Sequence, residues 1–186
     1  MDIRVVDNFL DDNNFNEVLS YCKNVSYSYG EVDELENIGD ETFCIGMTHQ
    51  LFPIRDFEKE LIDVVRSKNK VIQLFKEECK NQFPEIERYT MDQMYINCFA
   101  SSENPHFHID SLFPDLKSYT CLFYANNKWD LDDGGETQFY IDDILYGVPP
   151  EPNRMVIFDG RIKHRATSFR NRHRFTIAAK YVLPLS

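Results

Sequence analysis

The segment His106-Phe107-His108-Ile109-Asp110 places an imidazole and a carboxylate two residues apart. On a β-strand alternate side chains share one face, so His108 and Asp110 would point the same way. Two histidines and one carboxylate can hold a divalent metal and leave coordination positions open, which is the ligand set of non-haem Fe(II) oxygenases. A strand that is polar on one face produces the same pattern without any metal, so the pair alone allows both interpretations.

A third metal ligand must come from elsewhere in the chain, and the remaining histidines are His49, His164 and His173. His164 follows an apolar, strand-like run, which suits a ligand on a neighbouring strand. His106 has the same strand parity as His108 and is a further candidate ligand. The residues themselves therefore leave the third ligand open.

A second polar face is predicted on the last strand of the chain. Arg174, Thr176 and Ala178 alternate along it, and the opposite face is apolar enough to pack on helices. Arginine suits a carboxylate because its planar guanidinium can donate two parallel hydrogen bonds. Tyr95 and Tyr124 lie on predicted strands that flank the His-x-Asp segment, so their hydroxyls could line the same cavity.

The spacing of apolar residues, which indicates the elements that position these side chains, changes near residue 88. Before it, the spacing predicts one short strand and three amphipathic helices; after it come short strands with turn signals between them. Many short strands without intervening helices favour a sandwich or barrel, with the helices on one outer face. The expected elements are a strand over Ile3–Val6, helices over Asn14–Lys23, Phe57–Arg66 and Lys70–Asn81, and strands over Tyr89–Ala100, His106–Asp110, Ser118–Asn126, Glu136–Ile141, Arg154–Asp159, His164–Ser168 and Arg174–Leu183.

The composition fits one soluble domain of 186 residues, with a helical support region over 1–87 and a β core over 88–186. A net charge of −11 disfavours non-specific binding to nucleic acid. No apolar run approaches the ~20 residues of a membrane span, and the N-terminus lacks the pattern of a secretory signal. Five widely spaced cysteines predict reduced thiols in a cytoplasmic protein.

Positive charge is concentrated in residues 154–174, which hold seven bases and one acid. One of these bases is Arg174, on the polar face of the last predicted strand. The others form either a solvated hairpin rim, which is the commoner case for charged loops, or a surface that attracts an acidic substrate.

Residues 88–183 resemble the catalytic core of Fe(II)/2-oxoglutarate dioxygenases, especially the prolyl 4-hydroxylase-like branch. The opening segment DNFLDDNNFNEV also resembles the lead-in strand and helix of that family. The matching text consists of Tyr95, H-I-D at 108–110, T-C-L-F-Y-A-N at 120–126, W-D-L-D-D-G-G-E-T at 129–137, R-M-V-I-F-D at 154–159, His164 and R-F-T at 174–176.

This resemblance implies an α+β, mainly β fold, namely a double-stranded β-helix or jelly roll with the N-terminal helices packed on one outer face. It selects His108 over His106, because the family pattern is H-x-D. The implied Fe(II) ligands are His108, Asp110 and His164, and the implied 2-oxoglutarate site consists of Arg174, which pairs with the distal carboxylate, with Tyr124, Thr176 and Tyr95 around it.

The resemblance also implies the reaction. Fe(II), O2 and the cosubstrate 2-oxoglutarate would yield succinate and CO2 and hydroxylate an aliphatic C–H bond, with ascorbate as a reductant. Relatives that halogenate have a small residue in place of Asp110, so the intact carboxylate favours hydroxylation.

Two departures from the branch leave its proline substrate open. Collagen-type prolyl hydroxylases have lysine where this chain has Arg174, and the loop Cys98–Pro105 is longer than in the oxygen-sensing enzymes. A prolyl or other residue of a peptide or protein is the expected target. The alternatives are a small molecule, a nucleic acid base, or a non-catalytic jelly-roll binding module with a vestigial metal site. Against a base, the second arginine of the alkylation-repair dioxygenases is replaced here by Lys180.

Overall fold

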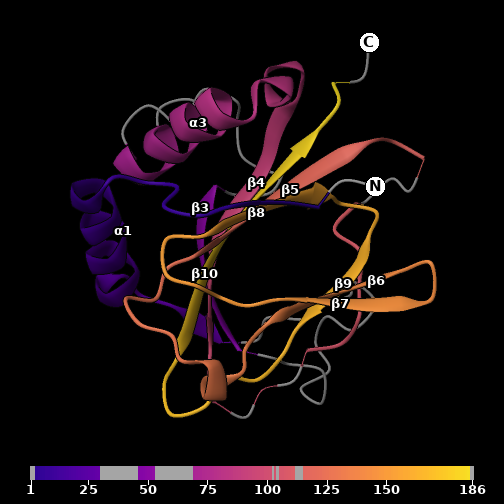
Figure 1. The fold of residues 1–186 in the computed structure, drawn as a ribbon. Coiled ribbons are helices and arrows are strands. Elements are labelled where there is room, and N and C mark those ends of the chain that lie inside the picture. The colour runs from indigo at the N-terminus through magenta and orange to yellow at the C-terminus, as the bar shows by residue number, and fades with distance from the viewer. Residues whose placement is uncertain are drawn as a thin grey trace.

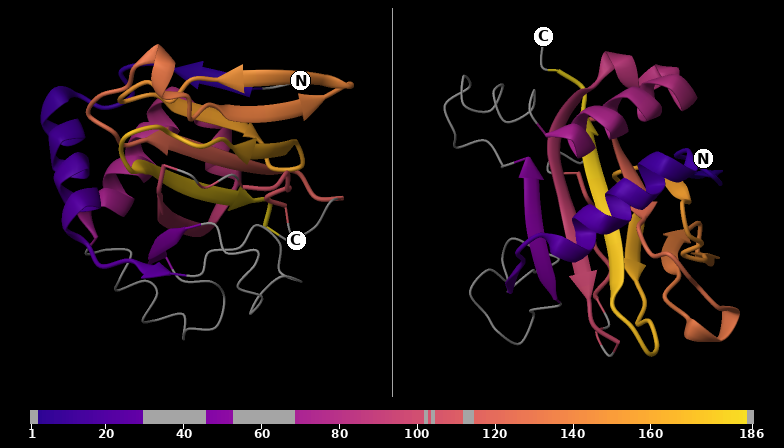
Figure 2. Two further views of the ribbon diagram at one scale, coloured as in Figure 1. Left: turned by 90° about the horizontal axis from the view of Figure 1, so that it is seen from below. Right: turned by 90° about the vertical axis from the view of Figure 1, so that its left-hand side faces the viewer.

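The computed structural model describes residues 3–29, 46–52, 69–101, 103, 105–111 and 115–184. Within these ranges two antiparallel sheets face each other, and two helices lie on the outer side of the larger sheet (Figures 1 and 2). The predicted helix over Phe57–Arg66 and the acidic segment 31–41 lie outside the described residues. None of the helices in the described ranges is long and apolar enough to cross a membrane.

The larger sheet has seven strands in the order β1-β8-β5-β10-β4-β3-β2, and the smaller has three in the order β7-β6-β9. In the larger sheet the bounds are β1 Ile3–Val6, β2 Ser28–Tyr29, β3 Met47–Phe52, β4 Thr90–Phe99, β5 Ser118–Tyr124, β8 Met155–Asp159 and β10 Arg174–Val182. In the smaller sheet they are β6 Thr137–Ile141, β7 Ile144–Val148 and β9 Lys163–Ala166. The helices are α1 Asp12–Asn24 and α3 Lys70–Gln82, with short 3-10 turns η3 Pro84–Arg88 and η4 Leu131–Asp133.

Each α-helix begins at a capping side chain. The Asp11 carboxylate accepts a hydrogen bond from the Asn14 amide at the start of α1, and the Asn69 side chain accepts from the first amides of α3. Such caps satisfy amides that have no partner within the helix. Apolar residues at helical spacing then turn one side of each helix toward the larger sheet.

An aromatic cluster joins the helices to the sheet. The Phe123 ring of β5 lies 5.0 Å from Phe75 of α3 and 5.9 Å from Phe9, measured between ring centroids. Phe15 of α1 reaches the same ring from 6.2 Å. The prediction that helices cover one outer face is therefore confirmed.

The opposite face of the larger sheet looks toward the smaller sheet. On β5, Tyr119, Cys121 and Phe123 belong to the helix-facing core, whereas Leu122 and Tyr124 pack between the sheets. The central strands are therefore buried on both faces, and the two facing antiparallel sheets agree with the predicted jelly roll.

One predicted strand is not formed, and the structure contains strands that were not predicted. The segment 106–110 is not a continuous strand: it forms a single bridge, between His108 and His164. Strand β7 was not predicted, because it is an edge strand whose side chains are largely exposed and which therefore lacks the apolar signature of a core strand. Strand β3 was not predicted either.

The described cysteines are Cys22, Cys79, Cys98 and Cys121, and all four are free and buried. The free state of these four agrees with the predicted reduced thiols, and buried thiols pack as small apolar side chains.

Candidate metal and cosubstrate site

Backbone pairing brings two histidines together. The His108 amide donates to the His164 carbonyl over 3.0 Å, and the His164 amide donates back over 2.9 Å. Residues opposed in this way point to the same side of the sheet, and their imidazole centroids lie 4.5 Å apart. The histidine from the segment 105–111 and the histidine from β9 therefore share one cavity.

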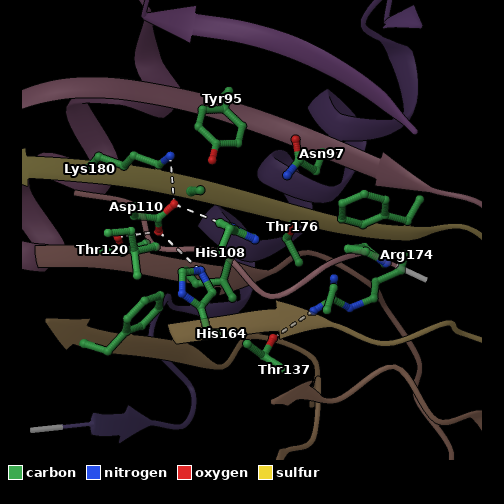
Figure 3. A pocket seen from close by; sticks show the side chains of 17 residues that line it. Tyr95, Asn97, His108, Asp110, Thr120, Thr137, His164, Arg174, Thr176 and Lys180 are labelled. Atoms are coloured by element: carbon green, nitrogen blue, oxygen red, sulfur yellow. Dashed lines mark hydrogen bonds and ion pairs between the residues drawn. The ribbon is translucent and has the colours of Figure 1, made fainter. Parts of the chain in front are cut away.

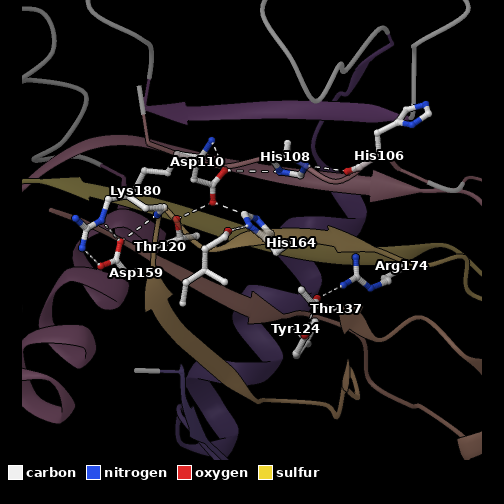
Figure 4. Close-up of polar contacts among 12 residues, drawn as sticks. His106, His108, Asp110, Thr120, Tyr124, Thr137, Asp159, His164, Arg174 and Lys180 are labelled. Atoms are coloured by element: carbon white, nitrogen blue, oxygen red, sulfur yellow. Dashed lines mark hydrogen bonds and ion pairs between the residues drawn. The ribbon is translucent and has the colours of Figure 1, made fainter. Parts of the chain in front are cut away.

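Asp110 completes the group. Its amide donates to the Gly160 carbonyl over 2.8 Å, which turns the carboxylate toward both imidazoles. The carboxylate oxygens lie 3.8 Å from Nε2 of His108 and 3.4 Å from Nε2 of His164. One ligand atom from each of the three residues lies within 4.8 Å of the others, close enough for one metal ion (Figure 4).

The imidazoles have an orientation suited to metal binding. Nδ1 of His108 lies 3.1 Å from the His106 carbonyl, and Nδ1 of His164 lies 2.9 Å from the Ile162 carbonyl. A carbonyl can only accept, so each Nδ1 carries a proton and each Nε2 faces the Asp110 carboxylate, where its lone pair would bind a metal when the ring is neutral. Such outer hydrogen bonds fix the tautomer of metal-binding histidines.

Asp110 is also paired with a lysine. Lys180 Nζ lies 2.8 Å from Oδ1, and the Thr120 hydroxyl donates to Oδ2 over 2.7 Å (Figure 3). Burial opposes ionisation of Asp110, but the charge of Lys180 and the neighbouring imidazoles hold its pKa well below the usual range. Burial likewise opposes the charge of Lys180, and Asp110 raises the pKa of that ammonium above its usual value.

Arg174 lies deeper in the same cavity and is 1% exposed. Its guanidinium donates to the Thr137 hydroxyl over 3.0 Å, while its Nε has no partner. Burial lowers the pKa of this guanidinium, although the nearby Tyr124 opposes that shift; arginine nevertheless stays protonated in proteins. A buried cation with an unused donor fits an anionic group such as a carboxylate.

The Tyr124 hydroxyl donates to the same Thr137 oxygen over 2.8 Å, and its ring lies 5.3 Å from the Arg174 guanidinium carbon. Burial raises the pKa of this phenol. Thr176 is buried opposite Tyr124 in the sheet register and, like Tyr95, lines the cavity. The four residues expected around 2-oxoglutarate thus lie on β4, β5 and β10, around the cavity or its wall.

The cavity has a volume of about 90 Å³. Its lining is fully buried at one end and partly exposed to solvent at the other. The Arg174 end is closed, whereas the His108 side chain is 18% exposed. Its lining is Tyr95, Asn97, Phe99, Pro105, His108, Ile109, Asp110, Thr120, Leu122, Thr137, Phe158, His164, Ala166, Arg174, Thr176, Ala178 and Lys180.

Sequence reasoning assigned no cavity role to Lys180, Thr120, Thr137 or Asn97. Strand parity was an available signal for three of them: Lys180 has the parity of Arg174, Thr120 has that of Tyr124, and Asn97 has that of Tyr95. No comparable signal pointed to Thr137.

The other histidines lie elsewhere. Nδ1 of His49 donates to the Ser26 carbonyl over 2.8 Å, and the ring packs against Tyr21 and Tyr27 on the helix-facing side. The His106 ring is turned away from the triad (Figure 4). His173 is exposed.

Several bases of the segment 154–174 are bound to neighbours. Ion pairs join Arg154 to Asp7, Arg161 to Asp159 and Arg172 to Asp133. These contacts favour the interpretation as a solvated rim over a surface that attracts an acidic substrate, since they give three of the bases a partner within the chain.

Comparisons with known proteins agree with this geometry. Residues 94–181 match the 2OG-Fe(II) oxygenase superfamily, whose members use Fe(II), 2-oxoglutarate and O2. No curated protein matches the chain in sequence.

Among solved structures, a prolyl-4-hydroxylase of Pseudomonas putida is 14% identical, with a TM-score of 0.66 over 99% of this chain and 93% of that one. A prolyl hydroxylase of Trichoplax adhaerens, in complex with a hypoxia inducible factor peptide fragment, is 18% identical, with a TM-score of 0.66 over 97% and 83%. A 2OG-Fe(II) oxygenase family oxidoreductase of Burkholderia pseudomallei is 13% identical, with a TM-score of 0.69 over 98% and 86%. At these identities the likeness is one of fold. Together with the family match and the His-Asp-His group, it identifies the segment 94–181 as a 2OG-Fe(II) oxygenase domain, prolyl hydroxylase-like in fold.

Proposed function

We propose that the protein is a dioxygenase that uses Fe(II), O2 and 2-oxoglutarate to hydroxylate an aliphatic C–H bond, with succinate and CO2 as co-products. The proposed target is a prolyl or other residue of a peptide or protein. One observation carries the proposal: the ligand atoms of His108, Asp110 and His164 converge within 4.8 Å, in a cavity that also holds a buried arginine.

His108 and His164 would bind the metal through Nε2, and Asp110 through a carboxylate oxygen. When bound, Fe(II) with 2-oxoglutarate and O2 supplies the oxidising chemistry. The residues contribute position: the backbone bridge sets the spacing of the histidines, and the Nδ1 contacts hold their tautomers. The carboxylate of Asp110 fills a position that halogenating relatives leave to a halide, which favours hydroxylation.

Arg174 would bind the distal carboxylate of 2-oxoglutarate, since its Nε is buried and has no partner. Tyr124 would support that end of the site, because its hydroxyl meets the same Thr137 oxygen. Thr176 and Tyr95 would line the space beside the cosubstrate.

Solvent exposure increases along the cavity from Arg174 to His108, and this supports a bulky substrate. The cosubstrate would occupy the closed end near Arg174, which leaves the more exposed side near His108 and Ile109 for the target C–H bond. A side chain of a peptide can enter such an opening while the rest of the molecule stays outside. The Trichoplax structure holds a peptide fragment in the same fold. Ascorbate as reductant and a cytoplasmic location stay predictions.

The direct test is succinate formation from 2-oxoglutarate with added Fe(II), together with mass spectrometry of a peptide library for products that gain one oxygen atom. We expect uncoupled succinate formation without peptide and faster formation with a true substrate. Failure to form succinate under any of these conditions would favour the non-catalytic binding module.

The ligand assignment has a matched pair of variants. His108→Ala and Asp110→Ala should each abolish Fe(II)-dependent turnover while the fold survives. His106→Ala removes the same side chain two residues away, where the ring faces away from the triad, and should retain turnover. Full activity in Asp110→Ala would show that the ligand assignment is wrong.

A further inference from the structure

A lysine faces the proposed metal-binding carboxylate at ion-pair distance. Lys180 extends from β10 and places Nζ 2.8 Å from Oδ1 of Asp110, whose side chain is 5% exposed. Nζ also lies 5.2 Å from the centre of the Tyr95 ring (Figure 3). The ammonium is therefore held in the wall of the cavity and is not directed to bulk water.

This position has two electrostatic effects of opposite sign. A buried carboxylate without a counter-charge is costly, and a cation beside it removes much of that cost. The same cation repels a divalent metal that binds the carboxylate. Lys180 therefore stabilises the metal-free protein and opposes metal binding.

Asp110 is held by groups from three parts of the fold. Lys180 of β10 contacts Oδ1, and Thr120 of β5 donates to Oδ2 over 2.7 Å. The Asp110 amide bonds to Gly160, in the turn between β8 and β9. Lys180 is the charged member of this set, so its contribution can be separated from that of the neutral Thr120.

We propose that Lys180 is a positioning residue, the built-in counter-cation of Asp110, which keeps the His-Asp-His group assembled before metal arrives and lowers its affinity for metal. This inference rests on the proposed role of Asp110 as a metal ligand. It assigns Lys180 a role in the metal-free protein that the bound metal partly replaces.

A thermodynamic cycle fixes the sign of the effect. Removal of the ammonium destabilises the metal-free protein strongly, because Asp110 loses its partner. The loss is smaller in the metal-bound protein, where the metal supplies positive charge. Since binding free energy and stability are linked, the variant must bind metal more tightly than the parent protein and must gain more stability from it.

The test compares Lys180→Met, Lys180→Arg and Thr120→Val with the parent protein. Mn(II) is the probe, without 2-oxoglutarate, near pH 8, where free histidines are neutral. Calorimetry gives the Kd, and thermal unfolding with and without Mn(II) gives the Tm shift. We expect Lys180→Met to bind Mn(II) about ten- to a hundredfold more tightly and to show the larger Tm gain. Lys180→Arg, which keeps the cation, should stay near the parent, and Thr120→Val should not bind more tightly.

A double variant provides the test if Lys180→Met folds poorly. Asp110→Asn together with Lys180→Met removes both charges and should restore much of the Tm of the metal-free protein. Without that rescue, the loss comes from packing and the counter-cation role fails. An unchanged or weaker Mn(II) affinity in Lys180→Met overturns the inference while leaving the proposed function intact. Absence of Mn(II) binding by the parent protein, or full binding by Asp110→Ala, overturns the metal site itself.

Discussion

Strands β5 and β10 each have one face toward the helices and one toward the smaller sheet, and the two faces have different roles. Toward the helices, Phe123 and Ile177 are fully buried in an apolar cluster. Toward the smaller sheet lie polar side chains that are hydrogen-bonded or ion-paired, such as Arg174 and Lys180. Because side chains alternate along a strand, a change on one face need not disturb the other. The residues that stabilise the fold and the residues that line the cavity therefore alternate along the same strands.

The largest effect is expected on the helix-facing side. Phe123→Ala should lower the free energy of unfolding by about 3–5 kcal/mol, because it opens a cavity among three other aromatic rings. Urea denaturation measures this loss. The variant that remains folded should bind Mn(II) with the parent affinity, and a large loss of metal affinity would show that the two faces are coupled.

On the cavity side, Arg174→Met should weaken 2-oxoglutarate binding by about 1.5–3 kcal/mol, the range for a hydrogen bond to a charged group. Calorimetric titration of the Mn(II)-loaded protein with 2-oxoglutarate measures the change. The free energy of unfolding should not fall, since among the described residues this buried guanidinium has no carboxylate partner. An unchanged affinity would place the cosubstrate carboxylate elsewhere.

Tyr124→Phe should act in the same direction but more weakly, by about 0.5–1.5 kcal/mol, because it removes one neutral hydroxyl. The same titration provides the measurement. The ring remains to pack against the guanidinium, from which it lies 5.3 Å away. A loss as large as that of Arg174→Met would mean that the hydroxyl contacts the cosubstrate directly with unusual strength.

The smallest effect is expected at the surface, outside both faces. The Arg154 guanidinium bonds to Asp7 and lowers the pKa of that carboxyl. The stabilisation is therefore complete above the ordinary pKa of about 3.9 and is lost as the pH falls through the lowered value. Asp7→Asn should cost below about 1 kcal/mol near neutral pH, and the difference should vanish in acid. Urea unfolding as a function of pH tests this, and a difference that persists in acid contradicts it.

The two faces of β10 could be predicted from the alternation of polar and apolar residues in the sequence. The polar side chains at 174 and 176 and the apolar ones between them indicated which way β10 faces, and the structure agrees. The resemblance named the residues that the structure then brings together as a group, His108, Asp110 and His164.

What escaped prediction depends on contacts distant in sequence. The segment 106–110 alternates like a strand, but its amides bond to His164 and to a turn carbonyl at Gly160, so it forms no regular ladder. The role of Lys180 depends on where that segment lies across the cavity, which no local pattern encodes. Strand β7 was missed because an edge strand can be exposed on most of its residues.

The anchoring of the His-x-Asp segment has a consequence for how such a protein can change. Two main-chain hydrogen bonds tie His108 to His164, and the amides of Asp110 and Ser111 both donate to Gly160. Among the described residues, His108 and Asp110 are thus anchored by backbone hydrogen bonds to β9 and to the turn that precedes it. Because these bonds set the spacing of the triad, a change in chain length on either side of the segment is expected to leave the triad in place while it alters what enters the opening.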